Sequence, residues 1–140
     1  RWTPSMAASF AVPEVTLGTI CGAGGTQRLP RLIGETRAKE MIFTGREITA
    51  ETAREWGLVN GVFTAGSLLE ETLNLAEEIA RNSPYAVTRA KRSVNGGREM
   101  LLEEALEWER SLFGECGESR DRKEGMTAFL EKRPRIFTGE

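Results

Sequence analysis

A glycine-rich loop near the beginning of this 140-residue chain constrains its fold more than any other feature. Glycine stands at positions 22, 24 and 25, and apolar residues recur with helical spacing directly after the loop. Glycine lets the backbone adopt conformations closed to other residues and lets a ligand approach the bare N–H groups. The start of the next helix adds unpaired N–H donors and partial positive charge. The fold must therefore place an open backbone loop against the start of a helix.

Glu14 lies shortly before this loop and is the first candidate for an acid–base group. The chain contains no histidine, which excludes serine–histidine–aspartate hydrolysis, histidine metal sites and histidine acid–base catalysis. A carboxylate beside aimed backbone donors suits proton transfer at a carbon next to a carbonyl. The alternative is that Glu14 caps a helix or pairs with an arginine, and that the glycines form an ordinary tight turn.

Composition limits the metal sites, redox sites and macromolecular partners that we expect. The two cysteines, Cys21 and Cys116, lack the spacing of a zinc site or a redox pair, so we expect reduced thiols, with a disulfide between them as the alternative. A net charge of -2 gives no reason to expect nucleic acid or an acidic membrane as partner. No run is apolar enough to span a bilayer, and no leader is visible.

The pattern along the chain predicts three parts, most of them helical. We expect an irregular arm over 1–9, a middle part over 10–64 that carries the glycine loop, and a helical region over 65–140. The middle part includes an extended segment over 10–15 and a brief strand over 58–63, and Ser67 begins a predicted capping box. The predicted helices run from 25 past Pro30 with a bend, and over 35–43, 49–56, 67–80, 84–97, 101–112 and 119–132.

Three motifs in order resemble the C-terminal half of the crotonase superfamily, the enoyl-CoA hydratases and isomerases. The first runs from Phe10-Ala11-Val12-Pro13-Glu14 through Leu29-Pro30. The second runs from Ala38 to Arg46 and resumes from Ala53 to Asn60, and the third from Ser119 to Pro134. The resemblance covers residues 10–140, and the ordered set is specific where a lone glycine loop is not.

The resemblance implies an α/β crotonase fold of the ClpP/crotonase-like spiral type. In the full protein, ββα turns stack into a core, and a helical C-terminal region builds the subunit contacts. This chain would supply the last part of the core over 10–64 and the oligomerisation region over 65–140. We therefore expect a homo-oligomer, a homotrimer or a hexamer formed as a dimer of trimers. The implied substrate is an acyl-CoA, with no metal and no cofactor apart from the CoA that the substrate carries.

The resemblance also assigns roles within the loop. In the hydratases, two glutamates hold one water that adds across the 2,3 double bond of the thioester. Glu14 matches the second glutamate, the general acid that protonates the α-carbon, and Gly22 matches a residue whose N–H helps to hold the water. Cys21 stands where many members have proline. The first glutamate and both oxyanion donors belong to the upstream half, so we expect the 140 residues alone to be inactive or nearly so.

Three further residues are implied substrate contacts: Gly24 in the loop, and Phe129 and Lys132 near the end of the last helix. Phe129 and Lys132 would contact the adenine and the 3′-phosphate of CoA, either from the same subunit or from a neighbouring one. The alternative is that the basic residues of this segment form a solvated helix face.

Within the superfamily, Thr44-Gly45-Arg46 and the segment 131–140 look most like the methylglutaconyl-CoA hydratase branch. That branch implies a mitochondrial enzyme, with a cytoplasmic location as the alternative. Some of its members bind RNA through a lysine-rich helix of the N-terminal half, and this activity does not transfer. The competing functional hypothesis is a truncated, non-catalytic crotonase-like module that oligomerises and binds CoA or another partner.

Overall fold

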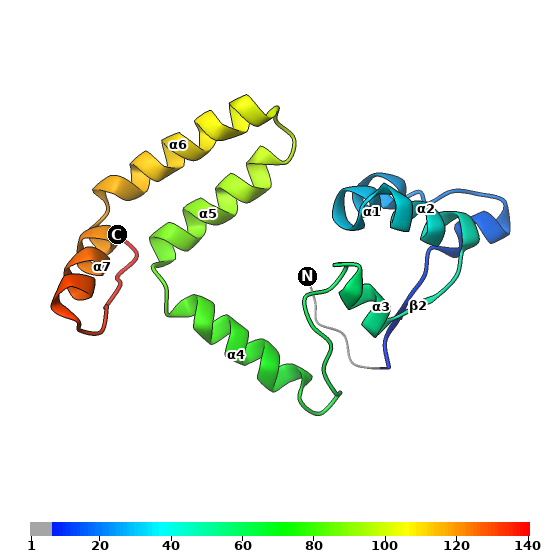
Figure 1. Ribbon diagram of the computed structural model, residues 1–140, viewed down its shortest axis with the longest axis horizontal. Helices are drawn as coiled ribbons and strands as arrows, with labels where there is room; N and C mark the ends of the chain where they lie inside the picture. The colour runs from blue at the N-terminus through cyan, green and yellow to red at the C-terminus, as the bar shows by residue number, and fades with distance from the viewer. Residues whose placement is uncertain (1–6) are drawn as a thin grey trace. The chain divides into compact units, whose positions relative to one another are not determined.

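The computed structural model describes residues 7–140 (Figure 1). Most of the predicted arm, residues 1–6, lies outside the described residues. The chain forms two compact units that divide within helix α4, between Leu73 and Asn74. Each unit is mainly helical, as the sequence predicts.

The first unit opens with a short sheet. Strand β1 (Ser9–Phe10) pairs antiparallel with β2 (Ile48–Thr49), with Phe10 opposite Ile48. Ser9 was expected to belong to the irregular arm, and it belongs to this sheet instead. The extended segment predicted over 10–15 is also wrong in its second half, because a 3₁₀ helix, η1 (Pro13–Leu17), begins there. Proline at a first helical position suits this helix, since its missing N–H would have no partner there.

Helices α1 (Gly25–Ile33) and α2 (Glu35–Thr44) follow the glycine loop. The predicted bend at Pro30 is not where the helix is interrupted: α1 continues to Ile33 and ends at Gly34, whose φ of 85° is unfavourable for other residues. Helix α2 ends at Gly45 as predicted. The Thr49 hydroxyl accepts a hydrogen bond from the Thr52 N–H (3.2 Å) and so caps α3 (Ala50–Glu55), also as predicted.

A small apolar core holds the first unit together. Partly buried side chains from η1, α1 and the segment after α3 pack around it, among them Val15, Leu32 and Leu58. Its buried members are Cys21, Ile33, Ala38 and Ile42.

The strand predicted over 58–63 does not form. Leu58 and Val59 both donate their N–H groups to the Ala53 carbonyl at the end of α3, at 2.8 and 3.3 Å. These two N–H groups close the end of a helix and are not available to a strand. Within 58–63, only Phe63 forms an isolated β-bridge.

Helix α4 (Leu68–Ala80) crosses the division between the units. The Ser67 hydroxyl pairs with Thr64 Oγ1 (2.8 Å) rather than with the N–H that the predicted capping box would use. The apolar side chains of α4 are exposed, Leu69 by 70% and Leu73 by 53%. This helix therefore presents an unpaired apolar stripe within the described part of the chain.

The second unit contains α5 (Pro84–Gly97), α6 (Leu102–Glu118) and α7 (Arg120–Glu131). Helices α5 and α6 lie side by side as an antiparallel pair (Figure 1). Gly96 permits their close approach, because a Cβ there would lie 3.0 Å from the Trp108 indole nitrogen. Both α5 and α7 begin where the sequence predicts, and the hydroxyl groups of Ser83 and Ser119 cap them. Among residues 7–140, no helix has the length and apolar character needed to cross a bilayer.

The segment after α7 is irregular but firmly held. The buried Asp121 carboxylate accepts hydrogen bonds from the Ser83 hydroxyl (2.6 Å) and from the N–H groups of Thr138 (2.8 Å) and Gly139 (3.1 Å). Its own N–H donates to the Glu140 carbonyl (2.9 Å). A single residue, Asp121, thus ties residues 138–140 to α7 and to Ser83, which caps α5.

Candidate active site

Glu14 is the second residue of η1. Its backbone carbonyl is hydrogen-bonded, whereas one of its two carboxylate oxygens has no partner among the described residues. The Glu14 carbonyl accepts from the Thr19 N–H (3.2 Å), and the Gly18 N–H closes the helix on the Val15 carbonyl (3.2 Å). The carboxylate oxygen Oε2 is buried and has no hydrogen-bond partner among the described residues. Buried polar oxygens are nearly always paired, so this one is available to a water or a ligand.

The Cys21 thiol is buried in the core of the first unit. Burial raises the pKa of the Cys21 thiol, and the charge and hydrogen bonding of Glu14 raise it further. The thiol is therefore protonated at neutral pH and is not a nucleophile. Cys21 and Cys116 are both free thiols, as we expected.

Backbone conformation and packing explain why two of the three loop positions are glycine. Neither explains the third. Gly24 precedes α1 with a φ of 86°, a conformation that favours glycine. A Cβ on Gly25 would lie 2.8 Å from the Cys21 Cβ, too close for any side chain. A Cβ on Gly22, in contrast, would meet nothing within 4 Å. Any requirement for glycine at position 22 therefore lies outside the packing of the described residues.

The start of α1 adds positive charge beside the loop, although two of its N–H groups are already paired. The N–H groups of Gln27 and Arg28 both donate to the Gly24 carbonyl, at 3.1 and 2.8 Å. The first turn contains no acidic residue, and the Arg28 guanidinium lies over Gly24. Both features favour an electron-rich ligand at this end of the helix.

The sequence matches the family model of the enoyl-CoA hydratases and isomerases over residues 4–140. The chain belongs to the enoyl-CoA hydratase/isomerase family. This confirms the superfamily and the fold class predicted from the three motifs. The chain spans about half the length of the curated relatives that it matches, because it covers 45% and 52% of the two described next.

Individual relatives agree with the family. The chain is 48% identical over 130 residues to the mitochondrial enoyl-CoA hydratase of Pongo abelii, covering 93% of this chain. It is 45% identical over 132 residues to the 2,3-dehydroadipyl-CoA hydratase of Escherichia coli, covering 94% of this chain. The crystal structure of an enoyl-CoA hydratase from Bacillus anthracis superposes with a TM-score of 0.93 at 44% identity, covering 99% of this chain and 54% of that one.

Phe129 and Lys132, the remaining predicted contacts, lie in the second unit. The Phe129 ring is 80% exposed near the end of α7, and Lys132 ends that helix in a left-handed conformation (φ 53°). The Lys132 N–H donates to the Phe129 carbonyl (3.3 Å), so the two residues share one turn. The structure thus brings the predicted site residues together as two groups, one in each unit.

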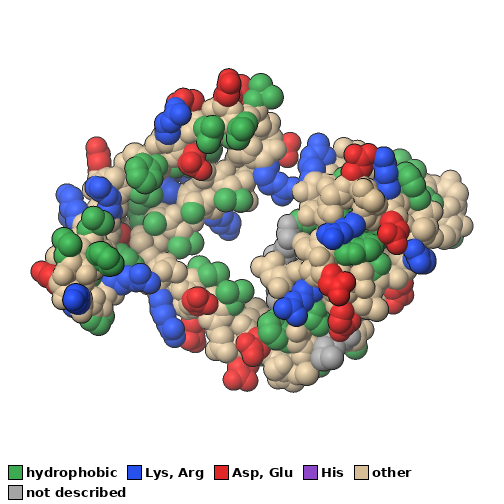
Figure 2. Space-filling model, viewed as in Figure 1, with side chains coloured by type: hydrophobic (Ala, Val, Ile, Leu, Met, Phe, Trp, Pro, Cys, Tyr) green, Lys and Arg blue, Asp and Glu red, His purple; other side chains and the backbone are tan. Residues whose placement is uncertain are grey.

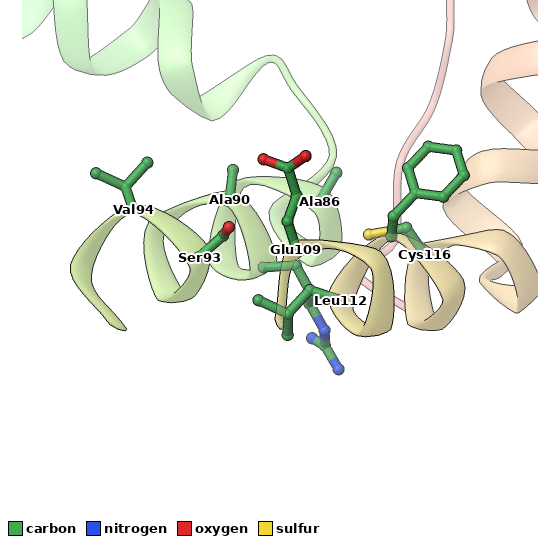
Figure 3. Close-up of a pocket in the computed structure, with 9 residues that line it drawn as sticks. Ala86, Ala90, Ser93, Val94, Glu109, Leu112 and Cys116 are labelled. Carbon is green, nitrogen blue, oxygen red and sulfur yellow. The ribbon is translucent and has the colours of Figure 1, made fainter. Parts of the chain in front are cut away.

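A second feature, absent from the sequence predictions, is an apolar hollow of about 280 Å³ between α5 and α6. Figure 3 shows Ala86, Ala90 and Ser93 of α5 along it, with Leu112 and Cys116 of α6. Small residues at helical spacing on α5 were the available signal, since they leave room between two packed helices. All residues that line the hollow belong to the second unit.

Proposed function

We propose that this chain is part of an enoyl-CoA hydratase that adds water across the 2,3 double bond of an acyl-CoA thioester. The buried Glu14 oxygen without a partner, set beside an open glycine loop, is the observation that carries the proposal. A structural carboxylate would be paired, whereas one that exchanges a proton with substrate needs an open oxygen.

In the proposed reaction, the oxygen of water bonds to C3 and a proton is delivered to C2. Glu14 supplies that proton as general acid, and the N–H of Gly22 helps to hold the water. Gly24 contacts the substrate through the loop backbone. The first glutamate, which accepts the proton that the water loses, and the oxyanion donors come from a preceding half of the protein, so the 140 residues alone hydrate substrate very slowly or not at all.

For CoA itself we propose Phe129 and Lys132. An exposed aromatic ring next to an exposed ammonium suits a stacked adenine and a phosphate. Both residues belong to the second unit.

We further propose a homo-oligomer, a trimer or a dimer of trimers. Its support is the exposed apolar surface of the helices after residue 67, which Figure 2 shows as hydrophobic side chains at the surface. Large exposed members are Leu69, Leu101, Leu102, Phe113 and Leu130. Methylglutaconyl-CoA as preferred substrate and a mitochondrial location are the finer parts of the proposal, and three relatives carry "mitochondrial" in their names while others are bacterial.

A second candidate is a non-catalytic module that oligomerises and binds CoA or another partner. It is favoured by the same exposed apolar surface and by the half-length match to the curated relatives. The two candidates differ in whether Glu14 takes part in a reaction.

Crotonyl-CoA hydration, followed by loss of the conjugated thioester absorbance, separates them. The 140-residue chain should be inactive, and a longer protein that includes the preceding half should be active. In that longer protein, Glu14→Gln should lower kcat by roughly 10²- to 10⁴-fold, the usual contribution of an acid–base group. Glu55→Gln, an exposed glutamate of the same unit, is the matched control and should leave the rate unchanged. Equal rates for Glu14→Gln and the parent protein would contradict the proposal.

A further inference from the structure

We infer that Glu124 is a positioning residue for Lys132: by binding Arg133, its carboxylate fixes the left-handed turn from which Lys132 presents its ammonium to the 3′-phosphate of CoA. The inference rests on the proposed function, in which Lys132 contacts CoA. It assigns a role to an ion pair that lies directly beside the proposed contact and does not itself touch the ligand.

The first support is the backbone of Lys132, whose φ is 53°. Among residues 7–140, it is the only residue other than glycine with a positive φ. Helices that end in this conformation usually do so at glycine, because a Cβ makes the conformation unfavourable. Lysine at this position is therefore strained, and such strain indicates a use for the side chain. Lys132 is exposed, and no hydrogen bond or ion pair holds its ammonium within the described part of the chain.

The second support is the way in which Arg133 is held directly after that turn. Its guanidinium donates to both carboxylate oxygens of Glu124, at 2.7 and 2.8 Å, and to the Glu131 carboxylate at 2.7 Å. The Arg133 N–H donates to the Ala128 carbonyl (3.0 Å). A two-point contact between planar groups fixes orientation as well as distance. Arg133 is thus occupied by carboxylates, whereas the neighbouring Lys132 is free to bind a phosphate.

The third support is that Glu124 also holds the chain beyond the turn. Its oxygen Oε1 accepts a hydrogen bond from the Ile136 N–H (2.9 Å), so one carboxylate closes residues 133–136 back onto α7. Fully exposed ion pairs contribute little, but the Glu124 and Arg133 side chains are only 24% and 37% exposed. Without this carboxylate, the turn at Lys132 would have to be ordered when CoA binds, at a cost in affinity.

Two substrates separate the phosphate contact from general stability. In the longer, active protein, KM is measured for crotonyl-CoA and for crotonyl-3′-dephospho-CoA, which lacks only that phosphate. We call the second KM divided by the first the phosphate preference, which does not depend on how much of a variant is folded. Lys132→Ala should lower the phosphate preference roughly tenfold, as for a lost hydrogen bond between charged groups. Lys132→Gly should lower it equally without lowering the melting temperature, because glycine adopts the left-handed conformation without strain.

Glu124→Gln gives the decisive sign. Removal of a negative charge near a phosphate site should by charge alone raise the phosphate preference. Positioning predicts the opposite, a fall of roughly threefold that acts through KM rather than kcat. Arg133→Lys keeps the positive charge but loses the two-point contact, so it should lower the preference as well. Glu140→Gln removes an ion pair with Arg120 at the other end of α7, and this matched control should leave the preference unchanged.

The outcomes distinguish the inference from the proposed function. A phosphate preference for Glu124→Gln equal to or above that of the parent protein, with Lys132→Ala still lowering it, would overturn the inference and leave the CoA contact standing. No effect of Lys132→Ala would overturn the proposed contact and the inference together. Unchanged hydration by Glu14→Gln would instead overturn the proposed hydratase reaction.

Discussion

Each unit of this chain buries part of a carboxylate, and the two carboxylates are treated in opposite ways. Asp121 of the second unit is 2% exposed and receives a hydroxyl and several backbone N–H groups. Glu14 of the first unit keeps a buried carboxylate oxygen that has no hydrogen-bond partner among residues 7–140. A carboxylate whose oxygens are all hydrogen-bonded stabilises a fold. A buried oxygen without a hydrogen bond costs stability unless a water or a ligand pairs with it.

The largest effect on stability should come from removing the hydrogen bonds that the Asp121 carboxylate accepts. Asp121→Asn replaces an acceptor oxygen by an amide NH₂ that opposes the N–H groups of Thr138 and Gly139. We expect the free energy of unfolding to fall by about 2–4 kcal/mol, the range for hydrogen bonds to a buried charge. Urea unfolding measures it, with Glu118→Gln on the exposed end of α6 as control. A loss no larger than that of the control would show that Asp121 does not hold the segment.

The packing beside Glu14 should give the next largest effect. Gly25→Ala places a methyl group 2.8 Å from the Cys21 Cβ, and overpacking of this kind costs about 1–3 kcal/mol. Gly22→Ala, in open space, should cost far less. Thermal melts compare the two variants. Adding Cys21→Gly to Gly25→Ala should recover part of the loss, and the absence of any recovery would contradict the clash.

Acid should weaken the second unit before the first. The Arg133 guanidinium and the Ile136 N–H lower the pKa of Glu124 to about 2, from an ordinary 4.5. Burial would raise the pKa of Asp121, but its hydrogen bonds outweigh this and lower it below 3.8. Stability from both groups is complete above about pH 4.5 and is lost as the pH falls towards 2. Amide exchange of Ile136, Thr138 and Gly139 should therefore accelerate over this range, and Glu124→Gln should flatten the response at Ile136.

The smallest effect on stability should come from substitution of Glu14, although this residue has the largest proposed effect on the rate of hydration. Glu14→Gln gives up no strong hydrogen bond, because Oε2 has none among the described residues. We expect a change in unfolding free energy below about 1 kcal/mol. A loss as large as that of Asp121→Asn would mean that Glu14 is a structural carboxylate, and the contrast between the two units would fail.

Local signals predicted most of the helices. Gly45, Thr49, Ser83 and Ser119 act on backbone groups within a few residues, so their effect can be read from a short stretch of chain. The errors arose where nearby backbone groups had competing partners. The strand over 58–63 failed because its first N–H groups close α3, and Glu14 lies in a 3₁₀ helix because Pro13 can begin one.

The candidate site shows the same limit. Glu14 and the loop glycines were found from residue types and family resemblance, but the close approach of Gly25 to Cys21 was not. Ser83 and Asp121 are 38 positions apart, and their hydrogen bond could not be inferred from spacing. Such long-range pairs appear only when the helices are placed in space.

The irregular segment after α7 should resist proteases despite its appearance. Trypsin would cut after Arg135, but the Ile136 N–H next to that bond is held by Glu124 (2.9 Å) and the Arg135 guanidinium by Asn82 (3.1 Å). A protease needs several residues in an extended conformation that makes no tertiary contacts. Both contacts, and the hydrogen bonds that Asp121 accepts from Thr138 and Gly139, must therefore break first. Lack of regular secondary structure here does not mean freedom to move, and the rate of cleavage in this segment reports how often these hydrogen bonds break.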